Sequence, residues 1–148
     1  LPQTHVLPSA TDAQFSARMG GLCDAIATDD PAPAQDAFFP LSAYIQVKGI
    51  SDPVHDYQTR LIVDYDQDIR YLHGYLASAT GPGTLDYVHV PEAAEWILPG
   101  VEYNKGSYYR FYGTVLGCTI GGQIHTFNVA SLISWRGEWY VVHLHSIR

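Results

Sequence analysis

The chain has 148 residues, enough for one domain that buries its own core, and its 47% hydrophobic and 16% charged residues exclude a disordered protein. Its net charge of −7, with Lys48 and Lys105 as the only lysines, excludes a nucleic-acid-binding surface, which needs clustered Lys and Arg. No apolar run approaches the ~18 residues of a membrane span, so we expect no transmembrane segment.

The N-terminal segment has no periodic pattern. We expect residues 1–8 to be disordered or extended and residues 9–148 to form a single domain. The chain begins at Leu1 rather than Met, which is typical of an exported protein whose signal peptide has been removed, and equally of a cloning boundary. We therefore expect a secreted or cell-envelope protein, with a cytoplasmic one as the alternative.

Two helices are predicted in the first third of the chain. Ser9–Asp12 has the form of a capping box and apolar residues follow at helical spacing, which predicts a helix over residues 12–27. The adjacent Gly20 and Gly21 weaken this helix, and an Asp-Asp-Pro sequence ends it. Residues 32–37 are expected to form a short second helix.

A strand and a long helix are predicted next. Residues 42–48 alternate between two sides, with Tyr44 and Lys48 on the same one, which predicts a strand. Asp52–Pro53 is typical of a helix start, and apolar residues then recur every three or four positions. This spacing predicts the longest helix, over residues 53–78, before a Gly-Pro-Gly sequence.

The second half of the chain predicts strands. Two short ones are expected over residues 85–90 and 95–98. A three-strand meander then follows over Ser107–Ile120, Gln123–Trp135 and Trp139–Ile147, with turns at Gly121–Gly122 and Arg136–Glu138. Helices followed by strands predict an α+β fold in which the helices pack on a curved antiparallel sheet. Long strands curl, so we expect the sheet to enclose a pocket.

The end of the chain resembles a known superfamily. Gly137–Ser146, with the sequence Gly-Glu-Trp-Tyr-Val-Val-His-Leu-His-Ser, is similar to the last strand of the NTF2-like (SnoaL-like, cystatin-fold cone) superfamily. In many members a short turn leads to Trp-x-hydrophobic-x-His-x-His-Ser, and the order of elements is similar over most of the chain. The resemblance implies a conical pocket between sheet and helices, often with dimerisation through the sheet. It implies no single reaction, because the superfamily includes isomerases, dehydratases, cyclases and non-catalytic binding domains.

The predicted turns sort the strands into two faces, because residues that oppose each other across a hairpin share a face. The first face, which we expect to pack under the helices, carries Tyr108, Arg110, Tyr112, Thr114, Leu116, Cys118, His125, Phe127, Val129, Ser131, Ile133, Trp135, Tyr140, Val142 and Leu144. The second face, which we expect a second subunit to cover, carries Tyr109, Phe111, Val115, Ile124, Thr126, Asn128, Leu132, Trp139, Val141, His143, His145 and Ile147. A bulge would move part of one strand to the other face.

Polar groups on an apolar face need partners or a cavity. The candidate pocket-lining residues are Tyr44, Lys48, Arg110, Tyr112, His125, Ser131 and Tyr140. His125 is the best candidate for a general acid or base, because the pKa of free imidazole is near ~6.5, and a hydrogen-bonded structural histidine is the alternative. Arg110 would bind an anion there, or form a salt bridge with Asp56, Asp64 or Glu102.

The positions of the histidines and cysteines bear on a possible metal site and a possible disulfide. His143 and His145 share a face, but His125 points to the other one and no third ligand is in place, so we expect no metal site. Cys23 and Cys118, 95 positions apart, are either two buried thiols or, in an exported protein, a disulfide. A phosphate loop and a dinucleotide fingerprint are both missing from the sequence, and we expect no cofactor.

These observations favour a secreted or envelope NTF2-like domain that binds a small apolar or aromatic ligand, or a partner protein, and forms a homodimer through the sheet. The alternative is a cofactor-independent cone-pocket enzyme with isomerase, dehydratase or cyclase-type acid–base chemistry. In that case His125 would carry the proton, and Arg110 with Tyr112 would hold an oxyanion. The enzyme requires His125 and Arg110 to face each other across a cavity.

Overall fold

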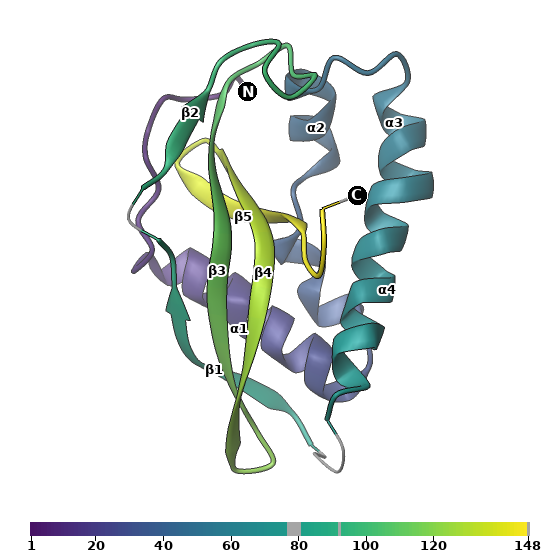
Figure 1. Ribbon diagram of the computed structural model, residues 1–148, viewed down its shortest axis with the longest axis vertical. Coiled ribbons are helices and arrows are strands. Elements are labelled where there is room, and N and C mark those ends of the chain that lie inside the picture. The colour runs from purple at the N-terminus through teal and green to yellow at the C-terminus, as the bar shows by residue number, and fades with distance from the viewer. Residues whose placement is uncertain (77–80, 92, 148) are drawn as a thin grey trace.

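The computed structural model describes residues 1–76, 81–91 and 93–147. Its helices precede its strands, and the strands form one curved antiparallel sheet of five, so the predicted α+β class is confirmed. Figure 1 shows α1 (Ala13–Thr28) crossing behind the sheet and α4 (Ile62–His73) running beside it. The helices therefore lie behind and beside the strands, and the opposite face of β3 and β4 is turned toward the viewer.

The first helix begins and ends where the sequence indicates. Asp12 caps α1 by accepting a hydrogen bond from the backbone N–H of Phe15 (3.0 Å), and Asp29 ends it in the left-handed conformation, with φ of 56°. A 3₁₀ helix, η1, follows over Ala32–Ala37. Both predicted helices are confirmed, with α1 displaced by one residue.

The predicted strand over residues 42–48 is wrong, because α2 occupies Leu41–Val47. Its buried side chains are Ala43, Tyr44 and Val47, which lie one and three residues apart and therefore on one side of a helix. Seven residues are too few to distinguish a two-residue period from a helical one. Tyr44 and Lys48 still project to the same side, since they are four residues apart.

The long helix is interrupted by a π turn. Asp52 caps α3 (Pro53–Asp56), the π turn η2 covers Tyr57–Leu61, and α4 continues to His73. In the π turn the backbone N–H of Ile62 donates to the carbonyl of Tyr57. The helix predicted over residues 53–78 is thus confirmed as far as position 73; residues 74–76 are not helical, and positions 77 and 78 lie outside the described part of the chain.

The sheet consists of β1 (Gly83–His89), β2 (Glu95–Ile97), β3 (Tyr108–Ile120), β4 (Gln123–Trp135) and β5 (Glu138–His143). The order is β1-β3-β4-β5, and β2 pairs with β3 beyond the end of β1. The two short strands and the meander are therefore confirmed, although β5 ends at His143, four residues before the predicted end. Gly121 and Gly122, with φ of 58° and 79°, form the two-residue turn between β3 and β4.

A bulge in β5 changes the predicted faces. The β3–β4 register is the predicted one, with Tyr112 opposite Ser131. Between β4 and β5, however, Leu132 pairs with Val141 while Ser131 pairs with His143, so Val142 is an extra residue. His143, predicted on the second face, therefore shares the first face with Ser131.

The helices bury the first face at the lower end of the sheet in Figure 1. The buried residues there are Leu116, Cys118, Ile120, Phe127 and Val129. Cys23 of α1 and Cys118 of β3 form a disulfide, with their Cα atoms 5.5 Å apart. The cysteines are thus bridged rather than free, and the bridge ties the first helix to the longest hairpin.

The N-terminal segment lies along the upper end of the sheet. Gln3 Nε2 donates to the backbone carbonyl of Ser134 (3.0 Å), and the ring of His5 stacks on Trp96 at a centroid distance of 3.7 Å. Residues 1–8 contain neither helix nor strand. At this end the second face is buried at Phe111, Leu132 and Trp139, whereas near the β3–β4 turn it is open and Ile124 is 59% exposed.

Candidate functional site

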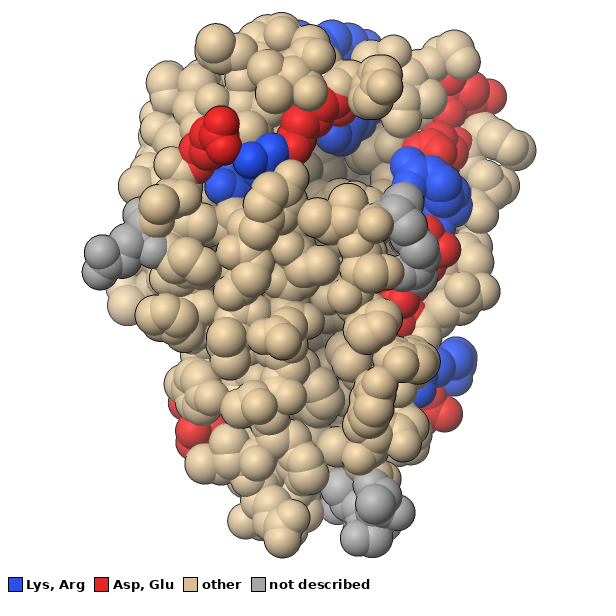
Figure 2. All heavy atoms as spheres, in the orientation of Figure 1, with Lys and Arg blue, Asp and Glu red and all other residues tan. Residues whose placement is uncertain are grey.

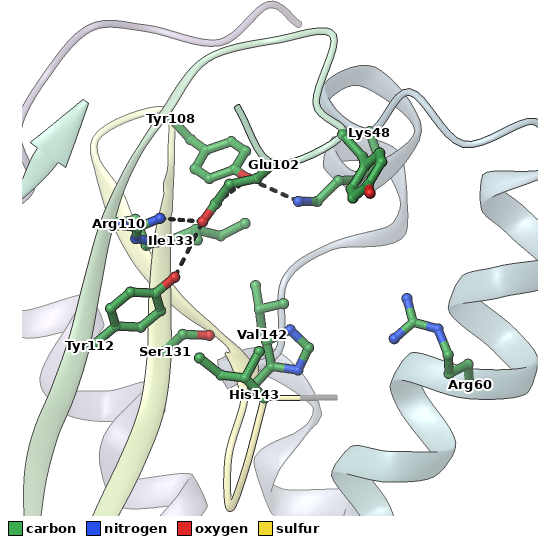
Figure 3. A pocket seen from close by; sticks show the side chains of 12 residues that line it. Lys48, Arg60, Glu102, Tyr108, Arg110, Tyr112, Ser131, Ile133, Val142 and His143 are labelled. Carbon is green, nitrogen blue, oxygen red and sulfur yellow. Dashed lines mark hydrogen bonds and ion pairs between the residues drawn. The ribbon is translucent and has the colours of Figure 1, made fainter. Parts of the chain in front are cut away.

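Two adjoining hollows, each of about 420 Å³, lie between the upper half of the first face and the segments that precede the sheet. Both are lined by Lys48, Arg60, Glu102, Tyr103, Val142 and His143, and we call the two together the Lys48 pocket. Figure 3 shows Lys48, Glu102 and Tyr108 near one another on one side and Arg60 across the open space. The first hollow adds Tyr108, Arg110, Tyr112, Ser131, Ile133 and Ile147, and the second adds Tyr44, Gly49, Ile50 and Leu61.

Glu102 is the centre of the polar wall. Its Oε1 accepts a hydrogen bond from Tyr108 Oη (2.7 Å), and its Oε2 accepts one from Tyr112 Oη (3.3 Å) and forms an ion pair with Arg110. Arg110 also pairs with Glu95 at 2.8 Å. Burial alone would raise the pKa of Glu102, but the hydrogen bonds from Tyr108 and Arg110 outweigh it and hold the pKa below the usual value. Glu102 is therefore a carboxylate at neutral pH.

A buried asparagine holds the loop that carries Glu102. Asn104 Oδ1 accepts from the backbone N–H of Glu102 (2.9 Å), and its Nδ2 donates to the carbonyls of Leu98 (3.1 Å) and Gly106 (2.8 Å). The side chain thus satisfies three backbone groups of an irregular segment, which fixes the loop. Glu102 is positioned by these bonds before any ligand is present.

Lys48 follows α2 and projects into the pocket. Its Nζ donates to Tyr108 Oη (2.8 Å) and lies 4.9 Å from the centroid of that ring, and the carbonyl of Tyr103 accepts from the next backbone N–H, that of Gly49 (2.7 Å). Burial lowers the pKa of Lys48, and the nearby charge of Glu102 opposes this in part. Among the described residues, no carboxylate lies within ion-pair distance of the Lys48 amine.

The opposite wall combines one ion pair with apolar side chains. Arg60 contacts Asp56 through Nε (2.7 Å) and Nη2 (2.8 Å), and Tyr44 Oη donates to the same carboxylate. The hydrogen bond from Arg60 is the main cause that lowers the pKa of Asp56. Ile50 and Leu61 are the apolar side chains on this side, whereas Ile133 and Val142 belong to β4 and β5 on the sheet side of the pocket.

The structure brings most of the predicted pocket residues together. Four of the seven, Lys48, Arg110, Tyr112 and Ser131, line one hollow. Tyr44 lines the adjoining one. Tyr140 lines a separate hollow of about 480 Å³, where the guanidinium of Arg18 lies 4.6 Å from the centroid of its ring.

His125 and Arg110 lie far apart. His125 pairs with Cys118 near the β3–β4 turn, whereas Arg110 pairs with Ile133, eight residues further along β4. At about 3.4 Å per residue, the two positions are roughly 27 Å apart along the strand. The His125 ring is half-buried, and its Nε2 has no hydrogen-bond partner within the described residues. The geometry that the enzyme hypothesis assigns to this histidine is thus not assembled.

Sequence reasoning missed several residues of the site. Glu102 entered it only as a possible salt-bridge partner of Arg110, and that ion pair is confirmed. His143 lies on the first face rather than on the predicted second one, because hydrophobic alternation does not reveal the bulge at Val142. Arg60 is four residues after Asp56, a spacing typical of a helix-surface ion pair, and the pair forms; the sequence does not indicate that Arg60 also lines the pocket.

Comparisons with known proteins do not assign the site. A scan against protein-family models, a search of curated proteins and a search of solved structures each find no match. Within the described residues, no helix is long and apolar enough to cross a membrane, and no group of three or more His, Cys, Asp or Glu side chains is placed to hold a metal ion. The function must be argued from the pocket itself.

Proposed function

We propose that this protein is a secreted or cell-envelope domain with an NTF2-like, cone-shaped fold that binds a small apolar or aromatic molecule in the Lys48 pocket. The observation that carries this proposal is a hollow lined by both polar and apolar side chains, in which the polar side chains hold each other in place. Its volume of about 420 Å³ is within the usual range for small-molecule sites. A site organised before binding loses little side-chain freedom when the ligand enters.

The charges of the pocket favour an uncharged ligand. Arg110 lies between two carboxylates, Glu102 and Glu95, and Arg60 is paired with Asp56. A strongly charged ligand would have to compete with these pairs. An aromatic or aliphatic body against Ile133 and Val142, with a hydrogen-bonding oxygen toward Lys48, fits this lining.

Two further features support the proposed cone-shaped fold and the proposed location outside the cytoplasm. Helices precede a curved antiparallel sheet, and the hollow lies between them, as in a cone-shaped fold. The Cys23–Cys118 disulfide is typical of proteins that reside in an oxidising compartment, outside the cytoplasm.

Ligand titration by NMR tests the proposal. We expect benzyl alcohol to shift the resonances of Val142 and Tyr112 at lower concentration than benzoate or benzylamine. Val142, which lines both hollows, is replaced by phenylalanine to fill the pocket, and Ile124→Phe on the exposed second face is the matched control. Val142→Phe should weaken binding about tenfold, equivalent to about 1.4 kcal/mol, and Ile124→Phe should leave it unchanged.

The result that contradicts binding in the Lys48 pocket is an absence of shifts there, or equal affinity in both variants. Circular dichroism shows whether Val142→Phe is folded. Tyr112→Ala, at a half-exposed position of the same hollow, provides a second test and should also weaken binding.

We also propose that a second copy of the chain covers the open part of the second face, near the β3–β4 turn, where Ile124 is exposed. Figure 2 shows charged side chains at the upper end and along the right edge of this view, with a smaller acidic group at the lower left edge and an uncharged area between them. Chains of net charge −7 repel each other, so self-association is favoured through such an area. Sedimentation should give twice the 16.4 kDa chain mass, and Ile124→Lys should return it to the monomer. A monomeric wild type would refute the pairing.

A further inference from the structure

The two lysines of the chain have different surroundings. Lys105 is exposed, whereas Lys48 is half-buried in the pocket, where its amine lies against the ring and hydroxyl of Tyr108. The backbone of Lys48 is fixed by a bridge to Asn104, in the loop that also carries Glu102. The amine is therefore held at a defined point of the cavity rather than moving freely on a flexible side chain.

We infer that Lys48 is a nucleophilic amine that forms an imine with an aldehyde or ketone bound in the Lys48 pocket. This inference rests on the proposed function, because the carbonyl compound must first enter that pocket. The ligand class is a small apolar or aromatic molecule with an uncharged carbonyl group, which matches the compensated charges of the walls. The step needs no residue other than the amine to bond covalently.

Three features of the site favour this chemistry. Burial disfavours the ammonium form of Lys48, and only the neutral amine is a nucleophile. The charge of Arg60, across the same hollow, also disfavours the ammonium form, and the partner carboxylate Asp56 opposes this. Tyr108 donates its own hydroxyl proton to Glu102, so its oxygen presents a lone pair to the Lys48 amine and positions it.

The reaction balances without an oxidant or reductant. The nitrogen lone pair adds to the carbonyl carbon, which forms a C–N bond, and the carbonyl oxygen takes the proton that the nitrogen loses. The resulting hydroxyl then leaves with the second N–H proton as water, and a C=N bond remains. The sum is amine plus carbonyl compound giving imine plus water.

Reductive trapping tests the inference on the full chain. The protein is incubated with benzaldehyde and cyanoborohydride, and the benzylated amines are identified by peptide mass spectrometry. Because the chain has only two lysines, Lys105 is an internal control for ordinary amine reactivity. We expect Lys48 to be labelled about tenfold faster than Lys105, and benzyl alcohol to protect Lys48 alone.

Two variants separate the role of the Lys48 amine from that of the Tyr108 hydroxyl. Lys48→Arg keeps the charge and should abolish trapping at this position. Tyr108→Phe keeps the ring but removes the hydroxyl, and should slow labelling of Lys48 about tenfold while Lys105 is labelled at the wild-type rate. An unchanged rate at Lys48 in Tyr108→Phe would refute the positioning role of the tyrosine.

The outcomes distinguish the inference from the proposed function. If benzyl alcohol shifts the pocket resonances but Lys48 is labelled no faster than Lys105, the reactive amine is refuted and ligand binding stands. If Val142→Phe does not slow the labelling of Lys48, the reaction does not use the pocket and the inference fails. If neither shifts nor selective labelling occur, both proposals fail.

Discussion

Gly20 and Gly21 are adjacent in α1, yet replacing each by alanine should have opposite effects. A Cβ atom on Gly21 would lie 2.3 Å from the carbonyl oxygen of Pro33 in η1, whereas the nearest atom to a Cβ on Gly20 is Leu85 Cβ at 3.9 Å. Alanine is favoured over glycine inside a helix by about 1 kcal/mol, so Gly20→Ala should raise the free energy of unfolding by up to that amount. Gly21→Ala should lower it by about 1–3 kcal/mol, because α1 and η1 must move apart.

Urea unfolding of both variants measures the difference. Each variant is the control for the other, since both gain the same helix propensity and differ only in the space around the new methyl group. Equal stabilisation by both substitutions would show that α1 does not approach the backbone of η1 this closely. The glycine pair, which the sequence shows only as a weak point of the helix, would then need another explanation.

Residues of the candidate site differ in how well the sequence predicts them. Arg110, Tyr112 and Ser131 were found because strand register follows from a two-residue turn, and register determines the face on which a side chain lies. Glu102 lies in an irregular loop whose shape depends on the hydrogen bonds of Asn104. No periodic pattern encodes such bonds, so its central position in the polar wall was not predictable.

Helices, turns and strands also differ in how well the sequence predicts them. The Gly121–Gly122 turn, the β3–β4 register and the end of α1 follow from local chemistry, and the sequence predicts them, whereas the N-cap of α1 is Asp12 rather than the Ser9 of the predicted capping box. The sequence does not predict α2, because its seven residues fit a strand period and a helix period equally. Packing of Tyr44 against the core decides between the two.

The β5 bulge changes which side chains line the Lys48 pocket. One extra residue, Val142, places both its own side chain and that of His143 in the Lys48 pocket. Regular alternation would have put one of them on the second face. Bulges depend on pairing with the neighbouring strand, and hydrophobic alternation alone carries no mark of them.

On the scale of the whole molecule, the disulfide should provide a large share of the stability. Cys23 and Cys118 are 95 residues apart, and a cross-link over a loop of that size removes unfolded-chain entropy worth about 4–5 kcal/mol. We expect the reduced protein to unfold at a markedly lower urea concentration than the oxidised one, with the difference in free energy approaching this value.

The double variant Cys23→Ala, Cys118→Ala controls for the reductant, and its stability should not respond to it. Equal unfolding midpoints for the oxidised and reduced wild type would show that the cross-link contributes nothing. Since the bridge lies at the opposite end of β3 from Tyr108, benzyl alcohol binding should be less sensitive to reduction than stability is.

The π turn allows the continuous helix from α3 to α4 to face two different neighbours. Below the π turn, α4 packs on α1, where His73 Nδ1 contacts the carbonyl of Ile26 (2.8 Å). Above it, Asp56 accepts a hydrogen bond from Tyr44, and Arg60, inside the π turn, is directed to the hollow. An added residue in a turn offsets what precedes it by about 100°, so an uninterrupted α-helix would hold one of these alignments and lose the other. The π turn thus rotates the part of the helix that lines the cavity relative to the part that packs on α1, so that each part faces its own neighbour.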